Sequence, residues 1–122
     1  MAVRINSPEE FDSVFRGFGG LVLALFTGSV DGATGKSWCP DCVDAEPFIE
    51  QARKENSETA FLYCDVGPRE SWRNQPGHPY RTNPITKVKC VPTLIRYQNG
   101  REIARLEEGR ICNQEMLNEF FR

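Results

Sequence analysis

The stretch Lys36-Ser37-Trp38-Cys39-Pro40-Asp41-Cys42-Val43 organises the rest of this chain. Two cysteines three residues apart on a helix lie about one turn from each other, so their Cα atoms fall inside the roughly 4.4–6.8 Å window that a disulfide requires. The pair can therefore open and close without unfolding the chain around it. An apolar run precedes it at residues 21–27, and helical spacing follows at residues 43–55. The sequence thus predicts a redox dithiol where a strand passes into a helix.

Length and charge narrow the class of protein. A chain of 122 residues is long enough for one domain, residues 1–122, and such a domain buries about two-thirds of its unfolded surface. Its 15 Lys and Arg residues nearly balance 17 Asp and Glu residues, for a net charge of −2. No basic block suggests nucleic acid or an anionic membrane, and no segment approaches the ~18 apolar residues of a membrane span. We therefore expect partners that are proteins or small molecules.

The five cysteines favour redox chemistry over a structural role. They are an odd number, and only Cys39 and Cys42 are close together, which argues against a secreted disulfide framework. A structural zinc site needs about four ligands, yet the only histidine is His78 and there is no second cysteine pair. The first eight residues also lack an apolar signal core. We expect a cytoplasmic protein that holds no metal.

Helical and strand patterns alternate from the start of the chain. Ser7 and Glu10 form a capping-box pattern around Pro8, which predicts a helix from residue 8. Its apolar stripe comprises Phe11, Val14, Phe15 and Phe18 and ends at Gly19-Gly20. The following residues are expected to form a strand buried on both faces (21–26), an exposed glycine-rich loop (28–37), a helix with Pro47 inside it (40–56) and a second strand (60–66). This order predicts a βαβ unit with the dithiol at the carboxyl end of its first strand.

The second half of the chain is less regular. Residues 67–87 predict only short helices, one beginning at Pro68 and one at residues 84–88, followed by a hairpin at residues 91–106 with Asn99-Gly100 at its turn. Asn113 is expected to cap a last helix. The residues of that helix expected to face inward are Met116, Leu117, Phe120 and Phe121. The predicted fold class is α/β, with a central mixed β-sheet flanked by helices on both faces.

This order of elements, with Trp-Cys-x-x-Cys after the first central strand and Val91-Pro92-Thr93 opening a later one, resembles the thioredoxin fold. Within that superfamily the Pro40-Asp41 filling, Ala45-Glu46-Pro47 and Trp72 are similar to the small cytosolic proteins of the Clot or thioredoxin domain-containing protein 17 family. The resemblance covers nearly the whole chain. It implies a monomeric disulfide reductase without a bound cofactor, which acts on cystine and selected protein disulfides and is recharged by thioredoxin reductase.

The two cysteines are expected to divide the chemistry between them. Cys39 would lie at the N-cap of its helix, where unpaired N–H groups and the helix dipole favour a thiolate, so it is the predicted nucleophile. Cys42, one turn deeper, would resolve the mixed disulfide and leave Cys39–Cys42 oxidised. Asp41 should oppose this thiolate and raise the pKa of Cys39 by like-charge repulsion.

The resemblance implies further roles around the dithiol. Pro92 would be a cis-proline facing the cysteines, with Val91 and Thr93 beside it in the substrate-docking wall. The rim would also include Trp38, Pro40 and Asp41. The position of the buried acid that thioredoxins carry on the preceding strand matches Ala24 here, so proton transfer at Cys42 would fall to water, Asp41 or Glu46. The two long connections, 28–37 and 67–87, are expected to border the dithiol and restrict large substrates.

The remaining cysteines and two other functions complete the hypotheses. Cys64 and Cys112 are expected to be inert apolar fillers, while Cys90 is expected near the dithiol rim, in a passive role. The first alternative function is a glutathione-linked, glutaredoxin-like reductase, although Asp41 and Asn99-Gly100 depart from that pattern. The second is a non-catalytic adaptor that binds a signalling or cytoskeletal partner.

Overall fold

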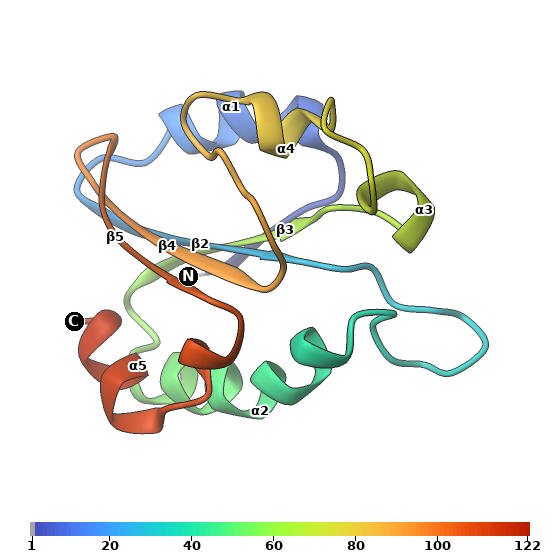
Figure 1. Ribbon diagram of the computed structural model, residues 1–122. Helices are drawn as coiled ribbons and strands as arrows, with labels where there is room; N and C mark the ends of the chain where they lie inside the picture. Colours follow the sequence, from blue (N-terminus) through green and yellow to red (C-terminus); the bar gives the residue numbers. More distant parts are fainter. Residues whose placement is uncertain (1) are drawn as a thin grey trace.

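The computed structural model describes residues 2–122 and shows a five-stranded sheet between two layers of helices (Figure 1). The elements are β1 (Ala2–Ile5), α1 (Pro8–Arg16), β2 (Leu21–Thr27), α2 (Pro40–Glu55), β3 (Ala60–Asp65), α3 (Arg69–Trp72), α4 (Pro79–Thr82), β4 (Thr93–Gln98), β5 (Arg101–Glu107), the 3₁₀ turn η1 (Glu108–Ile111) and α5 (Gln114–Phe120). Helices α1 and α4 cover one face of the sheet, and α2 and α5 cover the other. The predicted α/β class with helices on both faces is therefore confirmed.

The sheet has the strand order β1-β3-β2-β4-β5. Strands β2 and β3 are parallel and joined by α2, as the predicted βαβ unit requires. Strand β4 runs antiparallel to β2, and β5 antiparallel to β4 around the predicted Asn99-Gly100 turn. Because β2 is central, its carboxyl end opens between neighbours on both sides. The dithiol follows from this end.

The sequence did not predict strand β1. Residues Ala2 to Ile5 pair in parallel with β3, from Ala2 opposite Phe61 to Ile5 opposite Cys64. Only Ile5 of these four residues is buried, so the stretch offers too short an alternation to reveal a strand. Pairing with the edge of β3, rather than local pattern, makes these residues extended.

Strand β2 separates two apolar clusters. Val22, Ala24 and Phe26 belong to the cluster beneath α1 and α4, whereas Leu23 and Leu25 belong to the cluster beneath α2 and α5. All five residues are at most 3% exposed, which confirms the prediction of a strand buried on both faces. The buried strand therefore fixes where the loop that leads to the dithiol begins.

Three predicted details of the helices are wrong. Helix α1 ends at Arg16 rather than at Gly19-Gly20, and the Ser7 side chain forms no cap, since the Glu10 N–H donates to the Ser7 carbonyl instead. The helix predicted at residues 84–88 is absent. A short helix, α4, forms earlier in the chain instead and ends at Thr82. The helix expected from Pro68 is present as α3.

The C-terminal helix α5 begins as predicted, but one of the four residues expected to face inward, Met116, faces solvent. The Asn113 Oδ1 accepts a hydrogen bond from the Met116 N–H at 3.0 Å, so the cap is confirmed. Leu117 and Phe121 are buried and Phe120 is half-buried, but Met116 is 38% exposed. The prediction for Met116 is wrong because one face of this seven-residue helix suffices to pack against the body of the protein.

The described residues, 2–122, include no helix of the length and apolar character that crossing a lipid bilayer would require.

Candidate active site

The dithiol lies at the N-terminal end of α2, as predicted. Cys39 is the N-cap residue, in extended conformation, and its Sγ accepts a hydrogen bond from the Cys42 N–H at 3.2 Å. Pro40 is the first residue of the helix and has no N–H to leave unpaired. Both cysteines are free thiols and each is 5% exposed. The helix end therefore supplies one oriented donor to Cys39.

The contact between the two sulfur atoms dominates the ionisation of the pair. Hydrogen bonding with Cys39 lowers the pKa of Cys42 to about 7, and the hydroxyls of Thr27 and Ser37 and the Gly28 backbone act in the same direction. The same contact, with burial, raises the pKa of Cys39. The pair thus loses its first proton near neutral pH and holds the second between the sulfurs. The predicted lowering of the Cys39 pKa by the helix end is outweighed, because the neighbouring sulfur is a stronger perturbation than one backbone N–H.

Asp41 acts in the predicted direction but weakly. Its side chain is exposed, and its charge raises the pKa of Cys39 less than each of the other contributions does. Water screens an exposed carboxylate effectively. Asp41 therefore modifies the electrostatics of the dithiol without controlling them.

The opposite wall of the site is the Val91-Pro92 segment. The peptide bond between these residues is cis, which confirms the expectation that the family resemblance supplied. The Cys39 thiol donates to the Val91 carbonyl oxygen at 3.6 Å, so Cys39 and this wall are in direct contact. Thr93 is fully buried, and its hydroxyl donates to the Cys90 carbonyl at 2.6 Å. The Thr93 side chain thus holds the wall from behind rather than lining its rim.

Trp38 fixes the approach to the dithiol. Its indole Nε1–H donates to the Gly67 carbonyl at 2.9 Å, which ties the loop after β2 to the loop after β3. The ring packs directly on Gly28, where an added Cβ would lie 2.6 Å from Trp38 Cε2. Ser37 completes this corner, since its Oγ donates to the Gly28 carbonyl and accepts from the Cys39 N–H. Only glycine at position 28 leaves room for this indole.

The glycine-rich loop 28–37 folds back on itself. Val30 and Ser37 form an isolated antiparallel bridge, and the Asp31 N–H donates to the Lys36 carbonyl at 2.8 Å. The Asp31 carboxylate accepts from the Ala33 N–H at 2.8 Å. The loop is therefore a closed hairpin-like projection from the sheet end, visible beside α2 in Figure 1.

The two cysteines open on different hollows. Cys39 lines an open groove of about 580 Å³, which we call the Cys39 groove. Its wall comprises Trp38, Cys39, Pro40, Asp41, Arg69, Trp72, Arg73, Asn74, Arg81, Lys89, Cys90, Val91 and Glu108. The segment 67–87 thus borders the dithiol at Cys39, as predicted. None of the basic residues of this wall stood out in the sequence, because their segments carry no periodic pattern and only the fold brings them together.

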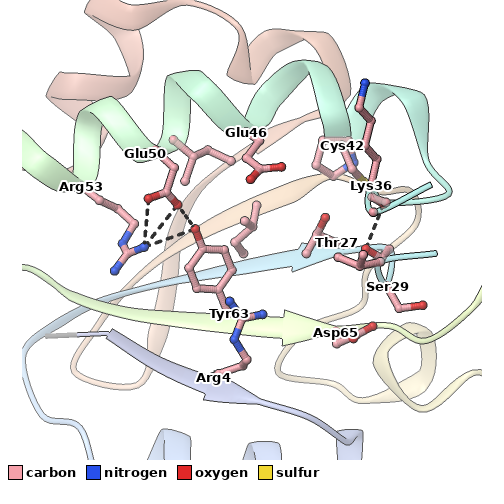
Figure 2. Close-up of a pocket in the computed structure, with 17 residues that line it drawn as sticks. Arg4, Thr27, Ser29, Lys36, Cys42, Glu46, Glu50, Arg53, Tyr63 and Asp65 are labelled. Atoms are coloured by element: carbon pink, nitrogen blue, oxygen red, sulfur yellow. Dashed lines mark hydrogen bonds and ion pairs between the residues drawn. The ribbon is translucent and has the colours of Figure 1, made fainter. Parts of the chain in front are cut away.

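Cys42 lines a second hollow of about 340 Å³ between α2 and the sheet, which we call the Cys42 cavity (Figure 2). The loop 28–37 contributes Gly28, Ser29, Val30, Gly35, Lys36 and Ser37; α2 contributes Cys42, Glu46, Ile49, Glu50 and Arg53; the strands contribute Arg4, Leu25, Thr27, Tyr63 and Asp65; and Pro92 completes the wall. The loop 28–37 therefore borders Cys42, whereas the segment 67–87 borders Cys39.

The prediction that Ala24 stands where thioredoxins carry a buried acid is wrong. Leu25 and Thr27, not Ala24, line the Cys42 cavity, because alternation along β2 turns Ala24 toward α1. The expectation that β2 places no acid there still holds. Glu46 does line the cavity, and in Figure 2 Glu46 and Cys42 lie along the same helix above Thr27. Of the two carboxylates that the sequence left open as proton acceptors, Glu46 lines this cavity, whereas Asp41 lines the Cys39 groove.

The far end of the Cys42 cavity is closed by a polar cluster. The Tyr63 hydroxyl donates to Glu50, and Arg53 contacts both of them. Burial, and then the hydrogen bond to Glu50, raises the pKa of Tyr63 to about 12. Tyr63 is therefore neutral at physiological pH and closes the cavity as a hydrogen-bond donor.

The three remaining cysteines differ in exposure. Cys64 is fully buried, and burial raises the pKa of its thiol, as expected of an inert filler. Cys112 is partly buried and packs against the apolar cluster beneath α2 and α5, so it is a filler at the edge of the core. Cys90 lines the Cys39 groove, as expected, and burial together with the nearby Glu107 and Glu108 raises its pKa. A protonated Cys90 is a poor nucleophile.

Within residues 2–122, no three His, Cys, Asp or Glu side chains gather in a way that could hold a metal ion.

A reduced Cys-x-x-Cys pair at a helix start, facing a cis-proline across a mixed sheet end, defines a thioredoxin-fold protein of the thiol oxidoreductase type. Thioredoxin O2 from Arabidopsis thaliana, solved in its oxidized state, matches with a TM-score of 0.67 over 99% of this chain and 95% of its own, at 17% identity. That likeness shows the fold.

Sequence relatives define the family more narrowly. The family model described as "Thioredoxin domain-containing protein 17-like, thioredoxin domain" matches residues 9–122, and the chain belongs to this family. Human thioredoxin domain-containing protein 17 is 42% identical over 117 residues, which cover 94% of this chain and 92% of that protein. The thioredoxin-like protein Clot from Arabidopsis thaliana is 41% identical over 85 residues, covering 69% of this chain and 63% of that protein.

Proposed function

We propose that this protein is a cytoplasmic, monomeric disulfide reductase that acts on cystine and selected protein disulfides and is recharged by thioredoxin reductase. The observation that carries the proposal is the free Cys39–Cys42 dithiol at the start of α2, in contact with the Val91-Pro92 wall. A thiolate pair that loses its first proton near neutral pH can attack disulfides under physiological conditions. No other group is needed for the transfer of two electrons.

In the proposed first step the Cys39 sulfur, which faces the open groove, attacks the substrate disulfide. A bond forms between Cys39 Sγ and one substrate sulfur while the substrate S–S bond breaks, and the released thiolate takes up a proton. Because the two cysteine sulfurs share one proton, the negative charge can reside on Cys39 as the substrate enters. The Cys42 N–H, at 3.2 Å from Cys39 Sγ, stabilises that charge.

In the second step Cys42 attacks Cys39 Sγ and releases the second substrate thiol. This step oxidises the pair to the Cys39–Cys42 disulfide and requires that Cys42 lose its proton. The Thr27 and Ser37 hydroxyls and the Gly28 backbone favour the Cys42 thiolate. Glu46 lines the same cavity and is exposed to solvent, so we assign to it the role of accepting the proton through water and passing it outward.

Substrate size follows from the two connections that border the dithiol. The segment 67–87 forms part of the groove at Cys39, and the closed loop 28–37 stands beside Cys42. Both reduce the flat surface on which a folded protein could dock. We therefore propose that small disulfides enter freely while a large folded substrate such as insulin reacts slowly. A folded variant with a shortened loop 28–37 should gain more insulin reduction than cystine reduction; an equal change in both rates would contradict this role.

The test of the proposed function is the source of electrons. NADPH with thioredoxin reductase should reduce the oxidised protein catalytically and support cystine reduction. If NADPH with glutathione and glutathione reductase supports turnover instead, the protein is a glutaredoxin-like enzyme. Failure with both systems, in a protein whose dithiol reacts with dithiothreitol, would leave the non-catalytic adaptor as the better hypothesis.

A further inference from the structure

The Cys39 groove carries an excess of positive charge that the whole chain does not. Its wall includes four cations and two anions, Arg69, Arg73, Arg81, Lys89, Asp41 and Glu108, which leaves two positive charges in excess. The complete chain has a net charge of −2. The groove at Cys39 is therefore more positive than the chain as a whole.

Three of these cations are free to meet a ligand. Arg69, Arg73 and Lys89 are exposed, and the ion pairs found within residues 2–122 involve Arg53 and Arg105 instead. Among the described residues, no ion pair therefore neutralises Arg69, Arg73 or Lys89 at close range. Charges in a concave, partly apolar wall act more strongly on an incoming ion than the same charges on an open surface.

Arg81, the fourth cation, has a structural role, because its guanidinium is bonded within the wall of the groove. Its guanidinium donates to the Trp72 and Lys89 carbonyls at 3.0 and 2.9 Å and lies 3.6 Å from the centre of the Trp72 ring. It thus ties the segment after β3 to the segment before β4. Arg81 thereby helps to hold the segments that carry Arg73 and Lys89, and substitution of Arg81 would confound any test.

We propose that the Cys39 groove selects peptide segments in which carboxylates flank the disulfide, with Arg69, Arg73 and Lys89 as the specificity-determining residues. This inference rests on the proposed disulfide reductase function and adds a substrate class to it. The cations attract the acidic flanks and hold one substrate sulfur against Cys39 Sγ. The thiolate of Cys39 then forms the mixed disulfide, and the substrate S–S bond breaks to release one peptide thiolate, which is protonated by water. Cys42 completes the two-electron reduction.

The experiment compares three short peptide dimers, each linked by one disulfide, whose cysteine is flanked by aspartates, by serines or by lysines. Prereduced protein is mixed with each dimer, and quenched samples are separated by mass spectrometry to obtain the rate of mixed-disulfide formation. The same rates with dithiothreitol correct for the intrinsic reactivity of each peptide. After this correction we expect the acidic dimer to react about tenfold faster than the basic one at low ionic strength. The advantage should nearly disappear at 1 M salt, where the screening length is about 3 Å.

Charge reversal identifies the responsible side chains. The double variant Arg69→Glu/Arg73→Glu should abolish or invert the preference, and Lys89→Glu should reduce it. The matched control Arg16→Glu/Lys54→Glu makes the same change of net charge at exposed positions outside the groove and should retain the preference. Circular dichroism and melting curves identify any variant that does not fold, and Lys89→Glu provides a second test if the double variant is unstable.

Each outcome supports or overturns a distinct statement. An unchanged acidic-to-basic ratio in both groove variants, or a ratio near one in the native protein, would overturn the inference. An equal loss of preference in the control would mean that net charge, not the groove, selects the substrate, and would overturn it as well. If the native protein fails to reduce even the serine-flanked dimer, the proposed reductase function itself fails, independently of charge.

Discussion

Cys39 and Cys42 lie one helical turn apart and are equally buried, yet they face different surroundings. Cys39 meets an open groove with excess positive charge, one backbone N–H and the Val91 carbonyl. Cys42 meets a narrower cavity with the Thr27 and Ser37 hydroxyls and a solvent-exposed carboxylate at Glu46. This difference supports our proposal that Cys39 exchanges with outside molecules, whereas Cys42 is deprotonated and reacts internally. Depth of burial does not distinguish them.

The most direct test of the difference between Cys39 and Cys42 is to remove each sulfur in turn. Cys42→Ser should accumulate a stable mixed disulfide with substrate on Cys39, because nothing remains to resolve it. Cys39→Ser should trap little, and both variants should lose essentially all turnover. Mass spectrometry of each variant after incubation with cystine measures the adducts. Equal trapping by both sulfurs would show that the two hollows give equal access.

The second prediction concerns the corner that separates the groove from the cavity. Gly28→Ala places a methyl group 2.6 Å from Trp38 Cε2, so the indole must move and its hydrogen bond to the Gly67 carbonyl must lengthen. We expect a loss of about 1–3 kcal/mol in the free energy of unfolding, or several degrees in melting temperature. Urea denaturation measures the first quantity.

Gly32→Ala in the same loop is the matched control. A Cβ at position 32 meets no atom within 4 Å, so this substitution should leave the stability nearly unchanged. Equal destabilisation by both substitutions would mean that the loop needs glycine for its backbone, not for the approach of Trp38.

The third prediction sharpens the role of the Cys42 cavity. Glu46→Gln should slow resolution of a preformed mixed disulfide about tenfold at the lower pH values, where Cys42 is still protonated. In that intermediate Cys39 has no S–H to donate, so the hydrogen bond that most lowers the pKa of Cys42 in the free dithiol is lost. The effect should fade at higher pH as Cys42 ionises without help. Stopped-flow rates across pH 6–9, at roughly one-unit intervals, give the profile.

Asp44→Asn removes the same charge from the same helix but from a residue outside the Cys42 cavity, and it should leave this profile unchanged. A uniform slowing of Glu46→Gln at every pH would argue that Glu46 has a structural role only.

The smallest effect is expected at Asp41. Asp41→Asn removes the weakest of the contributions that raise the pKa of Cys39, so alkylation by iodoacetamide below pH 7 should accelerate only about twofold to threefold. The comparison variant is Asp44→Asn, three residues further along α2. A slower reaction of Asp41→Asn would mean that Asp41 stabilises the thiolate through a hydrogen bond, and the electrostatic explanation would be wrong.

The sequence was sufficient for the parts of the protein in which local pattern and tertiary structure agree. The apolar run of β2, the start of α2 at Pro40 and the Asn99-Gly100 turn each have a local signature, so their structures match the prediction. Strand β1 has no such signature and depends on pairing with β3. The same reasoning explains α4, because residues 67–87 lack periodicity and their helices are selected by packing.

The site was predictable in its chemistry but not in its surroundings. The Cys39–Cys42 spacing is readable because the dithiol is contiguous in the chain. The groove cations come from both sides of α4, and the cavity wall joins residues as distant as Arg4 and Pro92. Only the fold brings these together. The sequence pointed to Ala24, but the neighbouring Leu25 is the residue that lines the Cys42 cavity. This error has a simple cause, because a shift of one residue along a strand exchanges its two faces.

The location of the aromatic side chains has a practical consequence. The chain has two tryptophans, and both Trp38 and Trp72 line the Cys39 groove. All indole fluorescence of the protein therefore originates at the surface where substrate is proposed to dock. Trp38 adjoins the nucleophile in sequence, and Trp72 lies under the Arg81 guanidinium, so the two fluorophores occupy unlike environments. The emission of the native, unlabelled protein is thus an optical signal of events in the groove, and single substitutions of Trp38 or Trp72 by Phe would separate the two sources.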